Sequence, residues 1–216
     1  YTSEDRVTVS LGLSEPNTGV EYEYYPGLKD AFFGHLKPER AERSLLYENI
    51  DGRRFVETSE KRGLVDRGWS GDACPLDANE DGWPDLYVLN MQGDDEYYQN
   101  AGGEYFIRKS RPLFPATPWG SMGIAVFDYD NDGRMDLFVT DMHSDMSEQI
   151  EPEREKEKSR MLHRDQHLPT SGSSIFGNAF FRSEGAGRFR EVSDLIGVEN
   201  YWPWGVSVGD LNADGY

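Results

Sequence analysis

The sequence is poor in several features that would indicate particular protein classes. Its 216 residues include a single cysteine, Cys74, so no disulfide can form within the chain and the redox compartment cannot be read from its thiols. No run of about 18 apolar residues occurs, so we expect no membrane span. Basic residues are few, 22 against 40 acidic ones, and the resulting net charge of −18 repels phosphate backbones. Nucleic acid is therefore not expected as a partner.

The residues that are present predict a globular protein. A hydrophobic content of 37%, with 13% aromatic residues, is enough to bury a sizeable core. The chain begins at Tyr1 without an initiator methionine or the basic-then-apolar profile of a signal peptide. It ends inside a motif whose full form occurs twice earlier, so we expect the natural polypeptide to continue beyond Tyr216.

An aspartate-rich segment recurs along the chain. Complete copies cover residues 77–86 and 128–137, and a third begins at Asp210, with offsets of 51 and 82 residues. Self-similarity at such spacing indicates a repeat architecture. A small and apolar segment precedes each copy, and a short β-prone run follows each complete one (86–89 and 137–140). Each copy is therefore predicted to be a turn between two strands.

Two further strands are predicted in each repeat. The segments 45–49, 96–100 and 179–183 resemble one another, and each is followed by a glycine-containing turn and an aromatic strand start, at 54–57, 105–108 and 189–192. Four strands in a unit of about 50 residues are typical of a β-propeller blade. The predicted fold is therefore all-β, a propeller of four-stranded blades.

The remaining segments define the domain organisation. Residues 1–41 carry no aspartate-rich loop and are interpreted as an N-terminal extension or a degenerate blade, whereas 42–216 hold the repeats. The longer second offset is explained by an insertion at about 144–174. Charged residues there, at 151–160, have helical i,i+3 and i,i+4 spacing and predict a short solvated helix. The insertion is either a plain exposed loop or an arm that contacts a partner.

The spacing within each loop favours calcium. Ca²⁺ prefers six to eight oxygen ligands, and a turn with carboxylates or amides at alternate positions directs them to one point. Loop positions one, three, five and nine supply such side chains, position seven would offer its backbone carbonyl, and glycine at position six (Gly82, Gly133) permits the bend. The predicted metal ligands are Asp77, Asn79, Asp81, Trp83 and Asp85 in the first loop, Asp128, Asp130, Asp132, Arg134 and Asp136 in the second, and Asp210, Asn212, Asp214 and Tyr216 in the third.

Two alternatives compete with this interpretation. An EF-hand begins with the same residues but needs a bidentate glutamate at position twelve, where Val88 and Val139 stand here, each inside an apolar β-prone run. Acidic turns without metal are the other alternative, because Asp, Asn and Gly are all good turn formers. Repetition at identical spacing disfavours it, since the clustered carboxylates would repel one another without a cation.

At these residues the chain resembles the FG-GAP or VCBS repeat family, whose loop pattern D-x-[DN]-x-D-G-x-x-D-[LIV] both complete copies match. The resemblance covers about residues 42–216 and implies a propeller, commonly of seven blades, with calcium held at the blade rim. The segment 141–146 and the strand sequences look most similar to secreted propellers related to cartilage acidic protein and to proteins that end in an ASPIC/UnbV domain. The Phe-Gly pair that names the family is absent before the loops, where only Gly123 and Gly205 stand in place.

Other residues offer weaker hypotheses. His143, between two aspartates, could act as a base or bind a transition metal, and His163 with His167 has the i,i+4 spacing of a zinc pair but lacks the HExxH glutamate. Cys74 aligns with small residues and is expected in a tightly packed inner strand. Four tryptophans near the inner strands are expected to pack between blades, with a sugar-binding platform as the alternative: Trp69, Trp119, Trp202 and Trp204.

We therefore expect a non-catalytic extracellular or periplasmic binding or assembly module in which calcium is structural. Its partners would be proteins or an extracellular glycan, and it could be one subunit of a larger assembly. Two alternatives remain open: an enzyme on the same scaffold, such as a polysaccharide lyase or hydrolase, and a purely architectural subunit. The location follows from the resemblance and from the abundance of calcium outside cells, where weak sites still fill.

Overall fold

The computed structural model describes residues 43–66, 68–91, 93–142, 174–175, 177–198, 200 and 203–214. The predicted extension 1–41 and all but the last residue of the predicted insertion 144–174 lie outside them. The described part is mostly β, which confirms the all-β prediction, and its two helices are one turn long each. No helix in this part of the chain is long and apolar enough to cross a membrane.

The first four-stranded sheet is an antiparallel meander in which each strand pairs with the next along the chain. It comprises β3 (Ser70–Leu76), β4 (Asp85–Asn90), β5 (Glu96–Ala101) and β6 (Tyr105–Arg108). Most of β4 is buried, whereas β3 and β6 at the edges are largely exposed. The apolar run at 86–89 thus forms a central strand, as its composition predicts.

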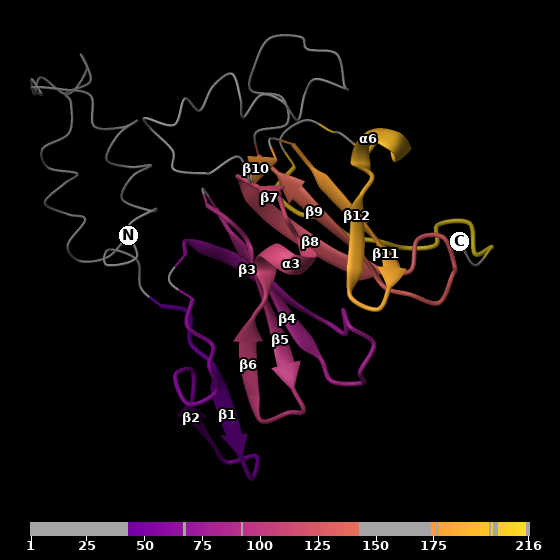
Figure 1. The fold of residues 1–216 in the computed structure, drawn as a ribbon. Coiled ribbons are helices and arrows are strands. Elements are labelled where there is room, and N and C mark those ends of the chain that lie inside the picture. The colour runs from indigo at the N-terminus through magenta and orange to yellow at the C-terminus, as the bar shows by residue number, and fades with distance from the viewer. Residues whose placement is uncertain are drawn as a thin grey trace, which may run out of the picture.

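The second sheet repeats this arrangement. Its order is β12-β11-β9-β8, with β8 (Ser121–Phe127), β9 (Asp136–Asp141), β11 (Ala179–Gly185) and β12 (Arg188–Glu191). β3 contacts β8, so the two sheets lie side by side (Figure 1). The short strand β10 (Ser174–Ile175), which lies between β9 and β11 in the sequence, pairs in parallel with β7 (Thr117–Pro118) in a separate two-stranded sheet. The last residue of the predicted insertion is therefore part of a strand.

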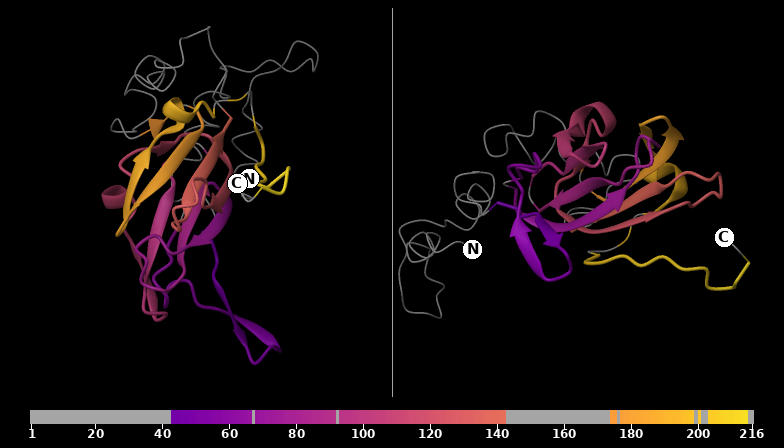
Figure 2. Two further views of the ribbon diagram at one scale, coloured as in Figure 1. Left: turned by 90° about the vertical axis from the view of Figure 1, so that its right-hand side faces the viewer. Right: turned by 90° about the horizontal axis from the view of Figure 1, so that it is seen from below.

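A third, smaller unit precedes the two sheets. β1 (Tyr47–Ile50) and β2 (Arg54–Glu57) form an antiparallel hairpin that corresponds in sequence to the last two strands of each sheet. Among the described residues these strands pair only with each other. The hairpin projects from the rest of the described structure (Figure 2), so all four residues of β2 are exposed.

Phe114 is the centre of the core between the two sheets. It follows α3 (Ser110–Leu113), a short helix that the sequence did not predict, and its side chain is fully buried. Its ring packs against aromatic rings from both sheets, with centroid distances of 5.0 Å to Tyr87, 5.6 Å to Tyr97, 5.1 Å to Phe181 and 4.9 Å to Phe189. Burial of the Phe114 ring couples the two sheets, because each sheet would lose part of its apolar contact without this ring.

The tryptophans have different environments. Trp119 is 2% exposed, as predicted for packing between repeats, whereas Trp204 is 67% exposed, which contradicts that prediction. Trp204 belongs to residues 203–210, which form no strand because none of the described strands pairs with them. This segment nevertheless runs beside β8: a Cβ at Gly123 would lie 3.0 Å from the Cα of Gly205.

Candidate metal centre

The two complete aspartate-rich loops connect strands, as predicted, whereas the described residues before the third loop, 203–209, form no strand. The first joins β3 to β4 and the second joins β8 to β9, so Val88 and Val139 lie in strands rather than in the second helix that an EF-hand requires. The loops also share their backbone conformation. Position four has a positive φ in all three, 61° at Glu80, 56° at Asn131 and 56° at Ala213. The sequence repeat is therefore also a repeat of local structure.

Glycine at position six has a conformational role. φ is +86° at Gly82 and +84° at Gly133, a region that residues with a Cβ rarely adopt. A Cβ at either position would meet no atom within 4 Å. Backbone geometry, and not lack of space, therefore requires glycine in both loops.

The aspartate at position one organises each turn through the loop's own amides. In the first loop, the Asp77 carboxylate accepts the backbone N–H of Asp81 at 3.0 Å and that of Gly82 at 2.8 Å. Asp128 in the second loop accepts the two corresponding bonds at the same lengths. In the third loop, Asp210 accepts the N–H of Asp214 at 3.2 Å. These bonds orient the carboxylate without the help of a metal.

The aspartate at position nine ties each loop to the third strand of its sheet. Asp85 and Asp136 are both 1% exposed. Each accepts one N–H from its loop and one from the third strand: Ala78 at 3.1 Å and Asn100 at 2.7 Å for Asp85, and Tyr129 at 3.0 Å and Ser183 at 2.8 Å for Asp136. Burial raises the pKa of both carboxyl groups above their usual value, and these hydrogen bonds oppose that shift.

Carboxylates converge in the second loop. One oxygen each from Asp128, Asp130 and Asp136 lies within 4.8 Å of the others. Opposite ligands of a calcium ion are separated by about twice its oxygen distance of roughly 2.3–2.6 Å, so this spacing fits one ion. Oδ1 of Asp130 is buried and accepts no hydrogen bond from any described residue. Because an unpartnered buried carboxylate oxygen is costly, this atom is suited to a cation.

Position five departs from the predicted convergence. Asp132 is not part of the three-carboxylate cluster. It accepts the backbone N–H of Arg134 at 2.9 Å, and its other oxygen pairs with the Arg134 guanidinium. Of the four side chains predicted to ligate in this loop, three are brought together and the fourth faces an arginine at position seven.

The first loop has the same layout with different chemistry at position three. Asn79 donates its side-chain N–H to Asp81 Oδ2 at 2.8 Å, and its amide oxygen accepts the Asp81 N–H at 3.2 Å. Tyr97 donates its hydroxyl proton to Asp85 at 2.6 Å. Carboxylate and amide oxygens are both ligands that calcium accepts, so Asp77, Asn79 and Asp85 offer the same kinds of donor as Asp128, Asp130 and Asp136.

The third loop follows the first. Asn212 donates to Asp214 Oδ2 at 2.6 Å, as Asn79 does to Asp81. Its predicted backbone ligand, Tyr216, lies outside the described residues. The structure thus shows the beginning of a third loop with the same side-chain pairing.

One functional candidate was missed in the sequence. Arg182 on β11 donates from Nε to Asp130 Oδ2 at 2.9 Å, and its terminal nitrogen lies 2.7 Å from the same oxygen. The hydrogen bond to Asp130 raises the pKa of this guanidinium. Arg182 is 52 residues from Asp130 in sequence. No local pattern connects the two, so only the pairing of β11 with β9 brings them together.

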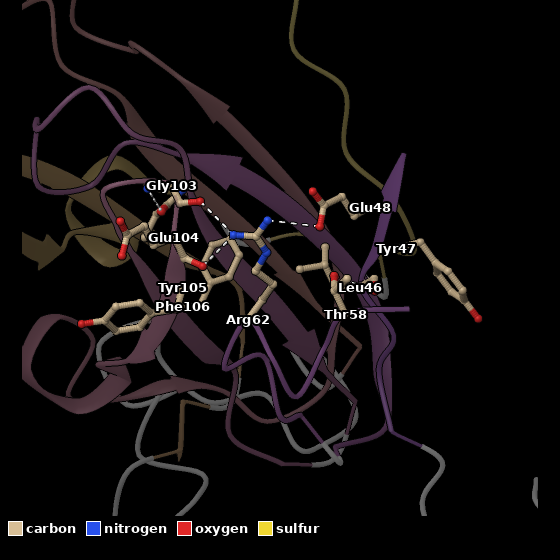
Figure 3. Close-up of a pocket in the computed structure, with 10 residues that line it drawn as sticks. Leu46, Tyr47, Glu48, Thr58, Arg62, Gly103, Glu104, Tyr105 and Phe106 are labelled. Atoms are coloured by element: carbon tan, nitrogen blue, oxygen red, sulfur yellow. Dashed lines mark hydrogen bonds and ion pairs between the residues drawn. The ribbon is translucent and has the colours of Figure 1, made fainter. Parts of the chain in front are cut away.

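A separate cavity of about 230 Å³ lies between the β1–β2 hairpin and the turn before β6 (Figure 3). Its main polar group is Arg62, which donates to the carbonyl oxygens of Gly103 at 3.3 Å and Glu104 at 2.8 Å and to the Glu48 carboxylate at 3.1 Å. These bonds join the hairpin to the first sheet. The residues around the cavity therefore connect the hairpin to the first sheet, and the Arg62 guanidinium is already hydrogen-bonded within the protein.

The remaining chemical candidates add no further site among the described residues. His143, His163, His167 and Trp202 lie outside the described residues. Cys74 lies on β3, as expected for a first strand, but it is only half-buried rather than tightly packed. Burial, followed by the charge of Asp72, raises the pKa of its thiol, which disfavours the reactive thiolate.

Comparison with known families agrees with this geometry. No curated protein is detectably similar to the chain. A family profile described as an FG-GAP-like repeat matches residues 77–139, which run from the first aspartate of the first loop to the strand after the second loop. The likeness to an FG-GAP-like repeat is thus shown for residues 77–139, which hold the two complete loops, strands β4 to β8 and β9 as far as Val139.

Proposed function

We propose that this chain is part of a calcium-stabilised β-propeller that acts as a non-catalytic binding or assembly module outside the cytoplasm, in the extracellular space or the periplasm. Calcium would be structural and held by the aspartate-rich loops. Protein partners or an extracellular glycan would bind the propeller, alone or as a subunit of a larger assembly.

The observation that carries the calcium proposal is the convergence of Asp128, Asp130 and Asp136 with a buried oxygen of Asp130 that accepts no hydrogen bond from the described residues. Three carboxylates at this spacing repel one another, and a divalent cation removes that repulsion. Calcium suits the site better than zinc or copper, because all its donors are oxygens and no histidine or cysteine belongs to the cluster.

The propeller proposal is supported by how successive repeats adjoin. A Cβ at Gly71 on β3 would lie 3.8 Å from the carbonyl oxygen of Ser121 on β8, and Gly123 on β8 in turn lies against Gly205. The first strands of the two complete repeats, β3 and β8, thus lie next to each other, and the segment before the third loop lies against β8. Blades arranged around a common axis have this relation between their inner strands.

Calcium titration of the chain by calorimetry, together with thermal melting before and after chelation, tests the proposal. We expect about one ion for each complete loop and a lower melting temperature after chelation, because an ion that binds only the folded state stabilises it. Asp77→Asn and Asp128→Asn should each remove one binding event, since calcium affinity depends on ligand charge.

Asp51→Asn is the matched control, because Asp51 is an exposed aspartate in the turn of the β1–β2 hairpin and belongs to none of the three aspartate-rich loops. It should leave both binding events intact. Absence of calcium binding, with melting unchanged by chelation, would show that the loops are acidic turns without a metal.

A further inference from the structure

The two complete loops differ in the cations that contact them. In the second loop, Arg182 binds Asp130 through two nitrogens at 2.9 and 2.7 Å, and Arg134 pairs with Asp132. A terminal nitrogen of the Arg182 guanidinium also lies 3.8 Å from Oδ2 of Asp132. Two guanidinium groups therefore offset part of the charge of the four aspartates in this loop.

The first loop has no such compensation from the described part of the chain. None of the described basic residues forms an ion pair with Asp77, Asp81 or Asp85. Position seven is Trp83, which contacts Gly103 and carries no charge. The same backbone therefore surrounds carboxylates in two different electrostatic environments.

Strand register identifies the residue that corresponds to Arg182 in the first sheet. Leu86 pairs with Tyr98, and Leu137 occupies the same place opposite Phe181. The next residue on the third strand is Gln99 in the first sheet and Arg182 in the second. The residues that follow these, Asn100 and Ser183, confirm the correspondence, because each donates its N–H to the position-nine aspartate of its loop.

We propose that Arg182 is a built-in counter-ion of the second loop, which supports this loop without metal and lowers its calcium affinity relative to the first loop. The inference rests on the proposed calcium function. The guanidinium binds one oxygen of Asp130 and leaves the other, Oδ1, directed to no described donor. An ion bound by Asp130 would then lie close to a positive charge and could not share both carboxylate oxygens freely.

The two loops should consequently respond differently to loss of calcium. In the second loop Asp130 keeps its partner Arg182 when no ion is bound, so this loop should retain its shape. The carboxylates of the first loop have only hydrogen-bond donors, and their mutual repulsion returns when the ion leaves. Chelation should therefore loosen the first loop more than the second.

Reciprocal exchange of the two corresponding residues tests the proposal. Calcium is titrated into the folded chain, and the backbone amide NMR signals of Gly82 and Gly133 report the two loops separately. Arg182→Gln should tighten binding in the second loop by roughly tenfold, the effect of one unit charge about 6 Å from a divalent ion in a water-like dielectric. Gln99→Arg should weaken binding in the first loop, and Arg182→Lys, which keeps the charge, should leave the second loop near its original affinity.

Melting with chelator provides a second readout. Arg182→Gln should melt lower than the unmodified chain in chelator and gain more from added calcium, because it loses the counter-ion and binds the metal more tightly. Binding in the second loop that is unchanged or weaker in Arg182→Gln would overturn the inference while the calcium function stands. Absence of any calcium response at both glycines would overturn the calcium function, and with it the inference.

Discussion

Replacement of Phe114 by alanine should separate the contribution of the interface between the two sheets from that of each sheet alone. The side chain is fully buried and contacts four aromatic rings, two from each sheet, at centroid distances of 4.9 to 5.6 Å. Truncation of a buried phenylalanine costs about 3–5 kcal/mol through lost transfer free energy and the remaining cavity. Because Phe114 contacts both sheets, we expect a loss of about 4 kcal/mol in the free energy of unfolding.

Urea unfolding at a fixed calcium concentration measures this loss. A decrease of this size would lower the melting temperature by roughly 10 °C for a chain of this length. Phe55→Ala is a matched control, because Phe55 is 69% exposed on β2 and its truncation should change the free energy of unfolding by no more than about 0.5 kcal/mol. A loss below about 1 kcal/mol in Phe114→Ala, or one equal to that of the control, would refute the role of Phe114 in coupling the sheets.

Two further predictions concern polar groups. Burial raises the pKa of Asp95 in the folded protein well above its usual range. Because the folded-state pKa is higher than the unfolded-state pKa of about 3.9, the protein loses stability as the pH rises from about 3.9 through the folded-state pKa. The melting temperature of Asp95→Asn relative to the original chain should therefore increase over this pH range, and a constant difference would contradict the shift. Arg62→Ala removes the hydrogen bonds to Gly103, Glu104 and Glu48. Hydrogen exchange at the β1–β2 hairpin should therefore accelerate by about tenfold, which corresponds to the loss of one net hydrogen bond. An unchanged rate, or equal acceleration in Arg62→Lys, would contradict the role of Arg62 in joining the hairpin to the first sheet.

Much of the local structure was predictable because it depends on residues close together in sequence. Aspartate, asparagine and glycine at fixed positions specify a turn through short-range bonds, as the N–H groups of Asp81 and Gly82 that donate to Asp77 illustrate. The β-prone runs on either side then identify strands, and a meander pairs each strand with its neighbour in sequence. The two complete sheets follow from these rules.

The loop prediction was incomplete at positions whose partners come from elsewhere. Asp132 was expected to converge with the other aspartates, but its oxygens are taken by the backbone N–H and guanidinium of Arg134. Trp204 was expected in the core, but the segment that carries it has no described strand partner and remains exposed. In both cases the residue type permits two environments, and the neighbours decide between them.

The sequence by itself determined the repeat, the four strands of each complete unit and the turn geometry of the loops, since these depend on short-range steric preferences and hydrogen bonds. Only the tertiary structure decided which side chains meet across strands. It placed Phe114 between the sheets and brought Arg182 to Asp130 across 52 residues. Such contacts depend on strand register and on the packing of one sheet against the next, and neither produces a recognisable pattern in the amino-acid sequence.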